Sequence, residues 1–156
     1  MQRFLLSLLL LSGVASGVSR AAPRVLDAKR YLLGVAAQPE WQEFERANPH
    51  GPQLELTFTA EANPAEATLL IRQRDVKTAW QVALNGRRLG VLEMLGQPLV
   101  RALSVPAGLL KAGENRLVIS RAPSRVLDDI VVGEFVLDAR PRAAVLAQAT
   151  LEVEVT

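Results

Sequence analysis

Apolar and polar residues alternate along most of the chain between residues 53 and 138, a period of two that is typical of β-strands with one buried face. In residues 53–59, for example, leucine and phenylalanine alternate with glutamate and threonine. Clusters of glycine, proline, asparagine and aspartate separate these runs at intervals that suit turns. The pattern predicts strands over residues 53–59, 67–74, 76–84, 89–92, 99–105, 116–120, 130–138 and 151–155. Gly133 is expected at a β-bulge in the penultimate run.

Asn85-Gly86 is the strongest turn signal in the chain. It lies between two apolar-alternating runs and predicts a two-residue type I′ turn, which needs positive φ at both central residues. Distance from such a turn fixes which residues face each other. The expected pairs are Leu84 with Arg87, Val82 with Leu89, and Trp80 with Val91. On this register Trp80 lies on an apolar face and is expected in the core.

Before residue 53 the pattern is different. Residues 24–35 are mixed and predict no clear element. Residues 39–48 predict a short helix, because Pro39 suits its first position and Pro49 ends it. Trp41 and Phe44 would share one face of that helix. Packing over the rest of the fold is the favoured role for this face, and an aromatic ligand platform is the alternative.

Two turn motifs, Leu-Asn-Gly at residues 84–86 and Leu-Leu-Lys-Ala-Gly-Glu-Asn at residues 109–115, follow each other between strands. This order resembles galactose-binding-like domains, as found in accessory domains of family 2 glycoside hydrolases and other secreted bacterial multi-domain proteins. The resemblance implies an all-β fold, an antiparallel jelly-roll β-sandwich of about eight strands with a short N-terminal helix. It implies a non-catalytic accessory or interaction module, with a carbohydrate-binding module as the alternative and a hydrolase as a weaker one.

The first residues resemble an export signal. A positive start at Arg3 is followed by a short apolar run and then by small residues. The expected organisation is a signal peptide over 1–22, a lead-in with the short helix over 23–52, the β-sandwich over 53–140, and a linker with a terminal strand over 141–156. The terminal strand would either close the sandwich or open a following domain. The expected location is periplasmic, cell-surface or secreted, with no membrane attachment after cleavage.

Charge and cysteine content limit the kinds of partner and bound metal that are expected. The chain has no cysteine, so disulfides and thiolate metal sites are excluded. Arg3 and Arg20 would leave with the signal, after which basic residues equal the 16 acidic ones in number. No basic stripe accompanies this balance, and aromatic residues are few. The expected partners are a carbohydrate or another protein domain, and nucleic acid is not expected.

The candidates for chemistry are few. His50 is the only histidine, which leaves no residue set for a hydrolytic triad. The aromatic residues that could contact a ligand are Tyr31, Trp41 and Phe44, because Phe4 would leave with the signal and the others lie in strand patterns. No cofactor is expected, although the resemblance allows a structural calcium. Its candidate ligands are Asp128, Asp129, Glu134 and Asp138, for which ion pairs or capping are the alternative roles.

Overall fold

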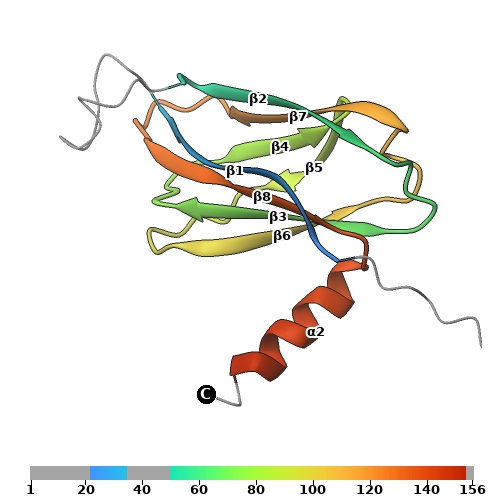
Figure 1. Cartoon of the computed structure of the whole chain (residues 1–156). Coiled ribbons are helices and arrows are strands. Elements are labelled where there is room, and N and C mark those ends of the chain that lie inside the picture. The colour runs from blue at the N-terminus through green and yellow to red at the C-terminus, as the bar shows by residue number, and fades with distance from the viewer. Residues whose placement is uncertain (1–21, 35–49, 154–156) are drawn as a thin grey trace, which may run out of the picture.

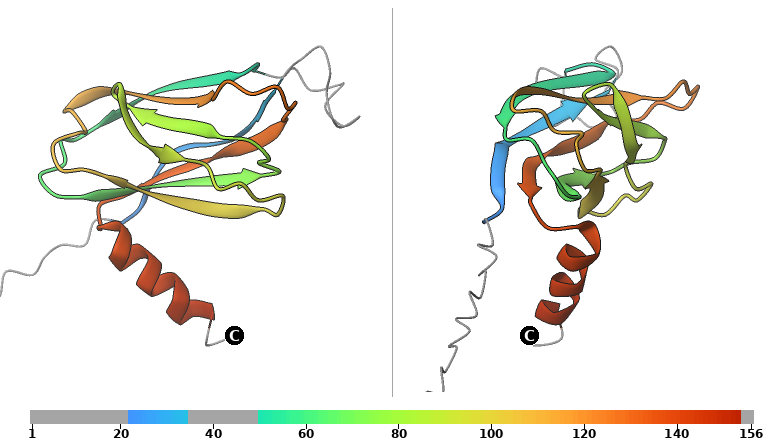
Figure 2. Two further views of the ribbon diagram at one scale, coloured as in Figure 1. Left: turned by 180° about the vertical axis from the view of Figure 1, so that it is seen from behind. Right: turned by 90° about the vertical axis from the view of Figure 1, so that its right-hand side faces the viewer.

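The computed structural model describes residues 22–34 and 50–153 as eight antiparallel strands in two four-stranded sheets with one helix (Figure 1). The elements are β1 (Arg24–Leu33), β2 (Gln53–Ala60), β3 (Ala67–Arg74), β4 (Trp80–Leu84), β5 (Arg87–Val91), β6 (Leu99–Val105), β7 (Gly113–Arg121), β8 (Ile130–Asp138) and α2 (Arg142–Val153). The chain is mostly β, which confirms the predicted antiparallel β architecture of about eight strands. The two sheets face each other in Figures 1 and 2, as expected of a β-sandwich.

The strand pairs are nested along the chain. β4 pairs with β5, β3 with β6, β2 with β7, and β1 with β8, so the chain forms one long hairpin with its tip at residues 85 and 86. Further pairing of β3 with β8 and of β4 with β7 folds this hairpin into two sheets. One sheet has the order β1-β8-β3-β6 and the other β2-β7-β4-β5.

The tip of the hairpin has the predicted geometry. Asn85 and Gly86 have φ values of 50° and 81°, as a type I′ turn requires. The expected register is correct for Leu84 with Arg87 and wrong farther from the turn, because a bulge follows Arg88 and pairs Val82 with Gly90 and Gln81 with Val91. Val91 therefore shares a face with Gln81 and not with Trp80. Leu92 takes the expected place of Val91 in the core, and its N–H donates to the Trp80 carbonyl at 2.9 Å.

The core lies between the sheets, and its buried residues come from every strand except β5, whose Leu89 packs against it half-buried. Trp80 and Phe135 are its largest fully buried side chains, so the prediction of a buried Trp80 is confirmed. In β3, Leu69 and Ile71 are buried while Leu70 is half-buried, as alternation across a sheet requires. The fold thus depends on period-two burial, as the sequence predicted.

Gly133 lies at the predicted bulge in β8. The register of β8 against β3 shifts between Leu70 and Arg72, opposite this point. A Cβ atom on Gly133 would lie 2.2 Å from the carbonyl oxygen of Lys29 in β1, so only glycine allows the strands to approach here. The next residue, Glu134, has φ of 49°. This conformation turns its side chain toward arginines of both neighbouring strands.

The predicted start of the sandwich at residue 53 is corrected. Residues 24–33 form β1 and belong to the sandwich, which therefore begins well before residue 53. The sequence of β1 shows no clear alternation of apolar and polar residues, because register shifts on either side of Asp27 interrupt it. The predicted signal over residues 1–22 and the predicted helix over residues 39–48 lie almost wholly outside the described residues.

The predicted terminal strand over residues 151–155 is wrong, because α2 runs to Val153. Its sequence is rich in alanine and leucine, which favour helix, and this outweighs a short alternation at the end. The carboxylate of Glu66 accepts a hydrogen bond from the N–H of Arg142 at 3.0 Å and so stabilises the helix N-terminus. The helix projects from the sandwich (Figures 1 and 2), and of its described side chains only Val145 is buried. Within the described part of the chain, no helix is long and apolar enough to cross a membrane.

Candidate functional site

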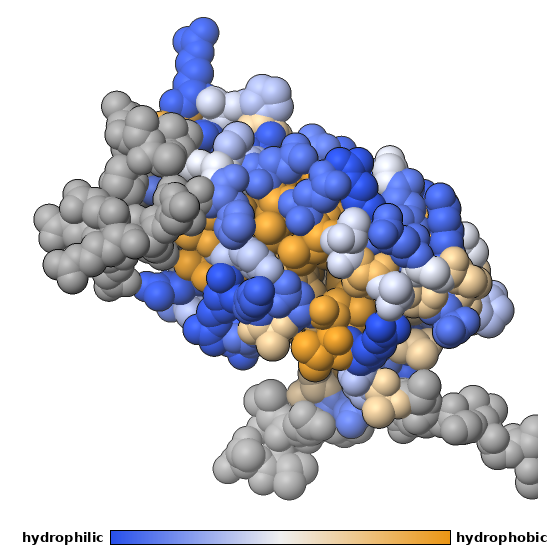
Figure 3. All heavy atoms as spheres, turned by 45° about the horizontal axis from the view of Figure 1, so that its top comes forward, coloured by the Kyte–Doolittle hydropathy of each residue, from blue (hydrophilic) through white to orange (hydrophobic). Residues whose placement is uncertain are grey.

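The most distinctive surface lies where β1 and β2, the edge strands of the two sheets, adjoin. We call this the open side, defined by the half-buried side chains of Leu26 and Tyr31 from β1 and of Leu56 and Phe58 from β2. All four pack against the core and keep part of their surface exposed. Figure 3 shows apolar surface in the middle of the face that includes these strands, between hydrophilic side chains. The open side thus offers apolar contact area within a polar rim.

Tyr31 is fixed within this surface. Its hydroxyl donates to the Asp27 carboxylate at 2.5 Å, and its ring lies 4.9 Å from that of His50 and 6.4 Å from that of Phe135. The hydrogen bond to Asp27, with burial and the carboxylate charge, raises the pKa of Tyr31 to about 12. Burial by itself raises the pKa of Asp27, but the hydrogen bonds from Tyr31 and from the Lys29 N–H outweigh it, and the net shift is downward. Tyr31 is therefore a rigid, protonated aromatic group.

A pocket of about 400 Å³ lies at one end of the open side, where β2 ends and β1 begins. Alanines make up half of its lining: Ala22, Ala60, Ala62, Ala65, Ala67 and Ala139. Arg24 and Glu61, both exposed, are its charged lining residues. We call it the alanine pocket. Its volume falls within the usual range for ligand sites, and its short side chains leave room for an apolar group.

Asn63 holds the wall of the alanine pocket in place. Its amide nitrogen donates to the carbonyls of Ala65 and Pro106 at 2.9 and 2.8 Å, and its amide oxygen accepts from the Leu110 N–H at 2.8 Å. Asn63 is 8% exposed, so these bonds satisfy an otherwise buried polar group. The loop between β2 and β3 is thereby tied to the loop between β6 and β7. The pocket is preformed.

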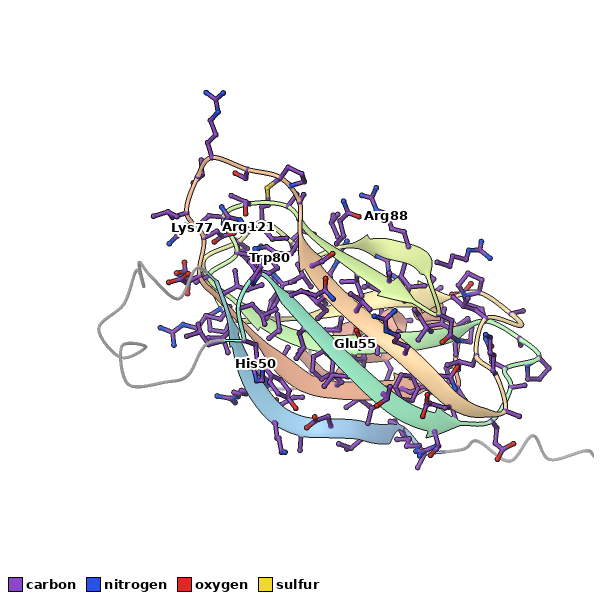
Figure 4. All side chains as sticks on the ribbon, turned by 90° about the horizontal axis from the view of Figure 1, so that it is seen from above. His50, Glu55, Lys77, Trp80, Arg88 and Arg121 are labelled. Atoms are coloured by element: carbon purple, nitrogen blue, oxygen red, sulfur yellow. The ribbon has the colours of Figure 1, made fainter. Side chains whose placement is uncertain are left out.

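Asp128 lies at the other end of the sandwich and is fully buried. Its carboxylate accepts hydrogen bonds from the Thr78 N–H at 2.7 Å, the Thr78 hydroxyl at 2.6 Å and the Trp80 indole N–H at 2.9 Å. Figure 4 shows Trp80 near Lys77 and Arg121 at this end. The carboxylate lone pairs point to protein donors, which is the capping role that the sequence left as an alternative to calcium.

The other three candidate calcium ligands each contact a different part of the protein. Asp138 is fully buried and accepts from the Arg140 guanidinium at 2.5 Å, and Asp129 is buried against Gly34. Glu134 lies on β8 between Arg30 and Arg72, at 2.5 and 2.6 Å, and these hydrogen bonds lower its pKa. Within residues 22–34 and 50–153, no group of three or more histidine or acidic side chains could hold a metal ion.

The sequence predicted one of the residues of this site. Tyr31 lies on the open side, whereas Trp41 and Phe44 lie outside the described residues. The alanine pocket was not predicted. The cluster Glu-Ala-Asn-Pro at residues 61–64 indicated a turn, and only the three-dimensional arrangement brings it beside the start of β1 and the end of β8.

The chain matches no protein-family model. Over 109 residues it is 31% identical to the glycine–tRNA ligase beta subunit of Pseudomonas aeruginosa. This match covers 69% of this chain and 16% of that protein. Over 91 residues it is 32% identical to the beta subunit from Ectopseudomonas mendocina, with 57% and 13% covered. The chain thus spans about a sixth or less of the length of these curated relatives.

Proposed function

We propose that this protein is a jelly-roll β-sandwich of the galactose-binding-like type that serves as a non-catalytic interaction module of an exported protein. The nested pairing of β1 with β8, β2 with β7, β3 with β6 and β4 with β5 carries the proposal. A long hairpin wrapped into two four-stranded sheets is the arrangement of a jelly roll. The motifs at residues 84–86 and 109–115 support the same family.

The buried carboxylates of Asp128 and Asp138 are already bonded to other groups of the protein, which supports a non-catalytic role. General acid–base or nucleophilic catalysis needs a carboxylate that can reach a substrate. Asp128 instead accepts hydrogen bonds from the β3–β4 loop and Trp80, and Asp138 is paired with Arg140. Both side chains stabilise loops at the ends of the sandwich.

The open side and the alanine pocket support binding as the role. They combine apolar surface, a preformed pocket and the two charged groups of Arg24 and Glu61. The pattern of the first 22 residues supports export. The similarity to the ligase subunits covers too small a share of those proteins for their activity to be proposed here.

Carbohydrate binding is the second candidate, and Tyr31 is the observation that favours it. Its ring is partly exposed on the open side and rigidly held, as stacking on a sugar requires. A glycan array with the mature domain tests this alternative. Arg88→Ala, at the opposite edge of the other sheet, is the control. A glycan that binds the wild type and Arg88→Ala but not Tyr31→Ala would support carbohydrate binding in place of the interaction role.

Site-specific photocrosslinking tests the main proposal. A benzoylphenylalanine at position 62 lies at the alanine pocket, and one at position 88 lies on β5, at the opposite edge of the sheet that contains β2 (Figure 4). We expect the exported protein to form a defined polypeptide adduct from position 62 and not from position 88. Equal adduct patterns at both positions, or none at either, would contradict an interaction role for this side.

A further inference from the structure

β2 is the longest edge strand of the sandwich that pairs without interruption. All eight residues from Gln53 to Ala60 pair with β7 without a bulge. Among the described residues no strand pairs with its other edge. An edge of this kind presents a row of backbone donors and acceptors to any extended chain that approaches it.

The backbone groups that face the free edge can be assigned. The Arg121 N–H donates to the Pro52 carbonyl, so residue 52 points its carbonyl toward β7. Backbone groups alternate in direction along an antiparallel strand. Leu54, Leu56 and Phe58 therefore bond to β7. The N–H and C=O groups directed to the free edge belong to Gln53, Glu55, Thr57 and Thr59.

The other edge strands are protected in ways that β2 is not. β1 is interrupted by register shifts on either side of Asp27, and β5 has only five residues and a bulge. At β6, the Arg101 guanidinium pairs with Glu93 and donates to the Val91 carbonyl of β5. Bulges, short length and charge are the usual means of preventing strand addition. On β2 the one charged side chain, Glu55, is paired with Arg116 of β7.

β1 supplies a floor beneath the free edge. In the views from above and from the end, β1 lies beyond β2 at this side of the molecule (Figures 2 and 4). A strand added to β2 would therefore lie over β1 and direct alternate side chains toward Leu26 and Tyr31. Where β2 ends at Ala60, the same strand would reach the alanine pocket.

This floor also indicates which occupant fits. A second copy that paired its own β2 here would bring both β1 strands to the same side of the joined sheet, where each already extends beyond β2. A single extended segment brings no second β1 strand to this side. Because Glu55 is neutralised by Arg116, the edge favours no net charge in its partner.

We propose that the free edge of β2 binds an extended polypeptide segment of another domain or protein by strand addition. The segment carries alternating apolar side chains over β1 and places one aliphatic side chain in the alanine pocket. Main-chain hydrogen bonds would provide affinity, and the pocket would provide specificity. This inference rests on the proposed interaction role and specifies its partner.

The test uses a synthetic peptide and a proline substitution. The probe is an acetylated, amidated peptide of alternating valine and threonine with a lysine at each end, and its control carries N-methyl groups on alternate backbone nitrogens. Thr57→Pro removes one free-edge N–H without touching the ladder to β7, and proline is tolerated at such positions. Thr57→Val keeps that N–H and is the matched variant. Far-ultraviolet circular dichroism tests whether both variants fold.

We expect NMR titration with the probe to shift the amides of residues 55, 57 and 59 in the wild type and in Thr57→Val. Thr57→Pro should weaken binding about tenfold or more, and the N-methylated peptide should bind as weakly. Equal binding by Thr57→Pro, or no binding of the probe to the wild type, would overturn strand addition. A wild-type dimer that Thr57→Pro converts to a monomer would overturn the choice of partner. A position-62 adduct alongside any of these results would leave the interaction role standing.

Discussion

The indole N–H of Trp80 donates a hydrogen bond to the carboxylate of Asp128 at 2.9 Å, and neither side chain is exposed to solvent. The same carboxylate accepts from the N–H and hydroxyl of Thr78. One buried carboxylate thus joins the loop between β3 and β4, the core tryptophan and the loop between β7 and β8. The two sheets are connected at this end through a polar contact.

Asp128→Ala is expected to lower the free energy of unfolding by at least about 3 kcal/mol. The substitution leaves buried donors of Thr78 and Trp80 without acceptors, and each such loss costs about 1–3 kcal/mol. Urea unfolding followed by circular dichroism measures it. A calcium role would give a different result, because a chelator would then lower the melting temperature of the wild type. We expect the chelator to change nothing.

The sequence predicted Trp80 in the core because its neighbours alternate with a period of two from a well-defined turn. It could not predict the partner, since Asp128 lies 48 residues away along the chain. The same limit explains the other differences. Bulges on either side of Asp27 concealed β1, a bulge after Arg88 shifted the register by one residue, and helix propensity outweighed a short alternation in α2. Local pattern determined most strands, and contacts between distant segments determined the pocket.

Gly133→Ala is expected to lower the free energy of unfolding by more than about 2 kcal/mol. The added Cβ would lie 2.2 Å from the Lys29 carbonyl oxygen, so β1 would have to move away from β8. Gly96→Ala is the matched control, because there the nearest atom would be 3.8 Å away. Thermal unfolding of both variants tests the contact, and equal melting temperatures would show that β1 is not held against β8 at this bulge.

Tyr31 is the only tyrosine, so its ionisation can be followed directly by absorbance at 295 nm. Its pKa is raised to about 12, so the hydrogen bond to Asp27 contributes fully below the ordinary tyrosine pKa of about 10 and is lost as pH rises through about 12. At pH 11 the folded protein should show little tyrosinate. Asp27→Asn removes the charge and should lower the midpoint. An unchanged midpoint in this variant would mean that Tyr31 does not bond to Asp27.

Removal of residues 142–156 should leave the sandwich folded. Val145 is the only buried side chain among those described in α2, so the expected loss is about 1–2 kcal/mol. Chemical unfolding of the truncated protein measures it. A loss several times larger would show that α2 belongs to the core.

Hydrogen exchange along β2 tests the central claim, that its edge is free to accept a partner. In the monomeric protein alone, NMR-detected exchange should be fast at Glu55, Thr57 and Thr59 and slow at Leu54, Leu56 and Phe58, which bond to β7. Saturation with the alternating peptide should slow the first three amides and leave the others unchanged. Equal protection of all six amides in the free protein would show that the edge is already covered and would contradict this account.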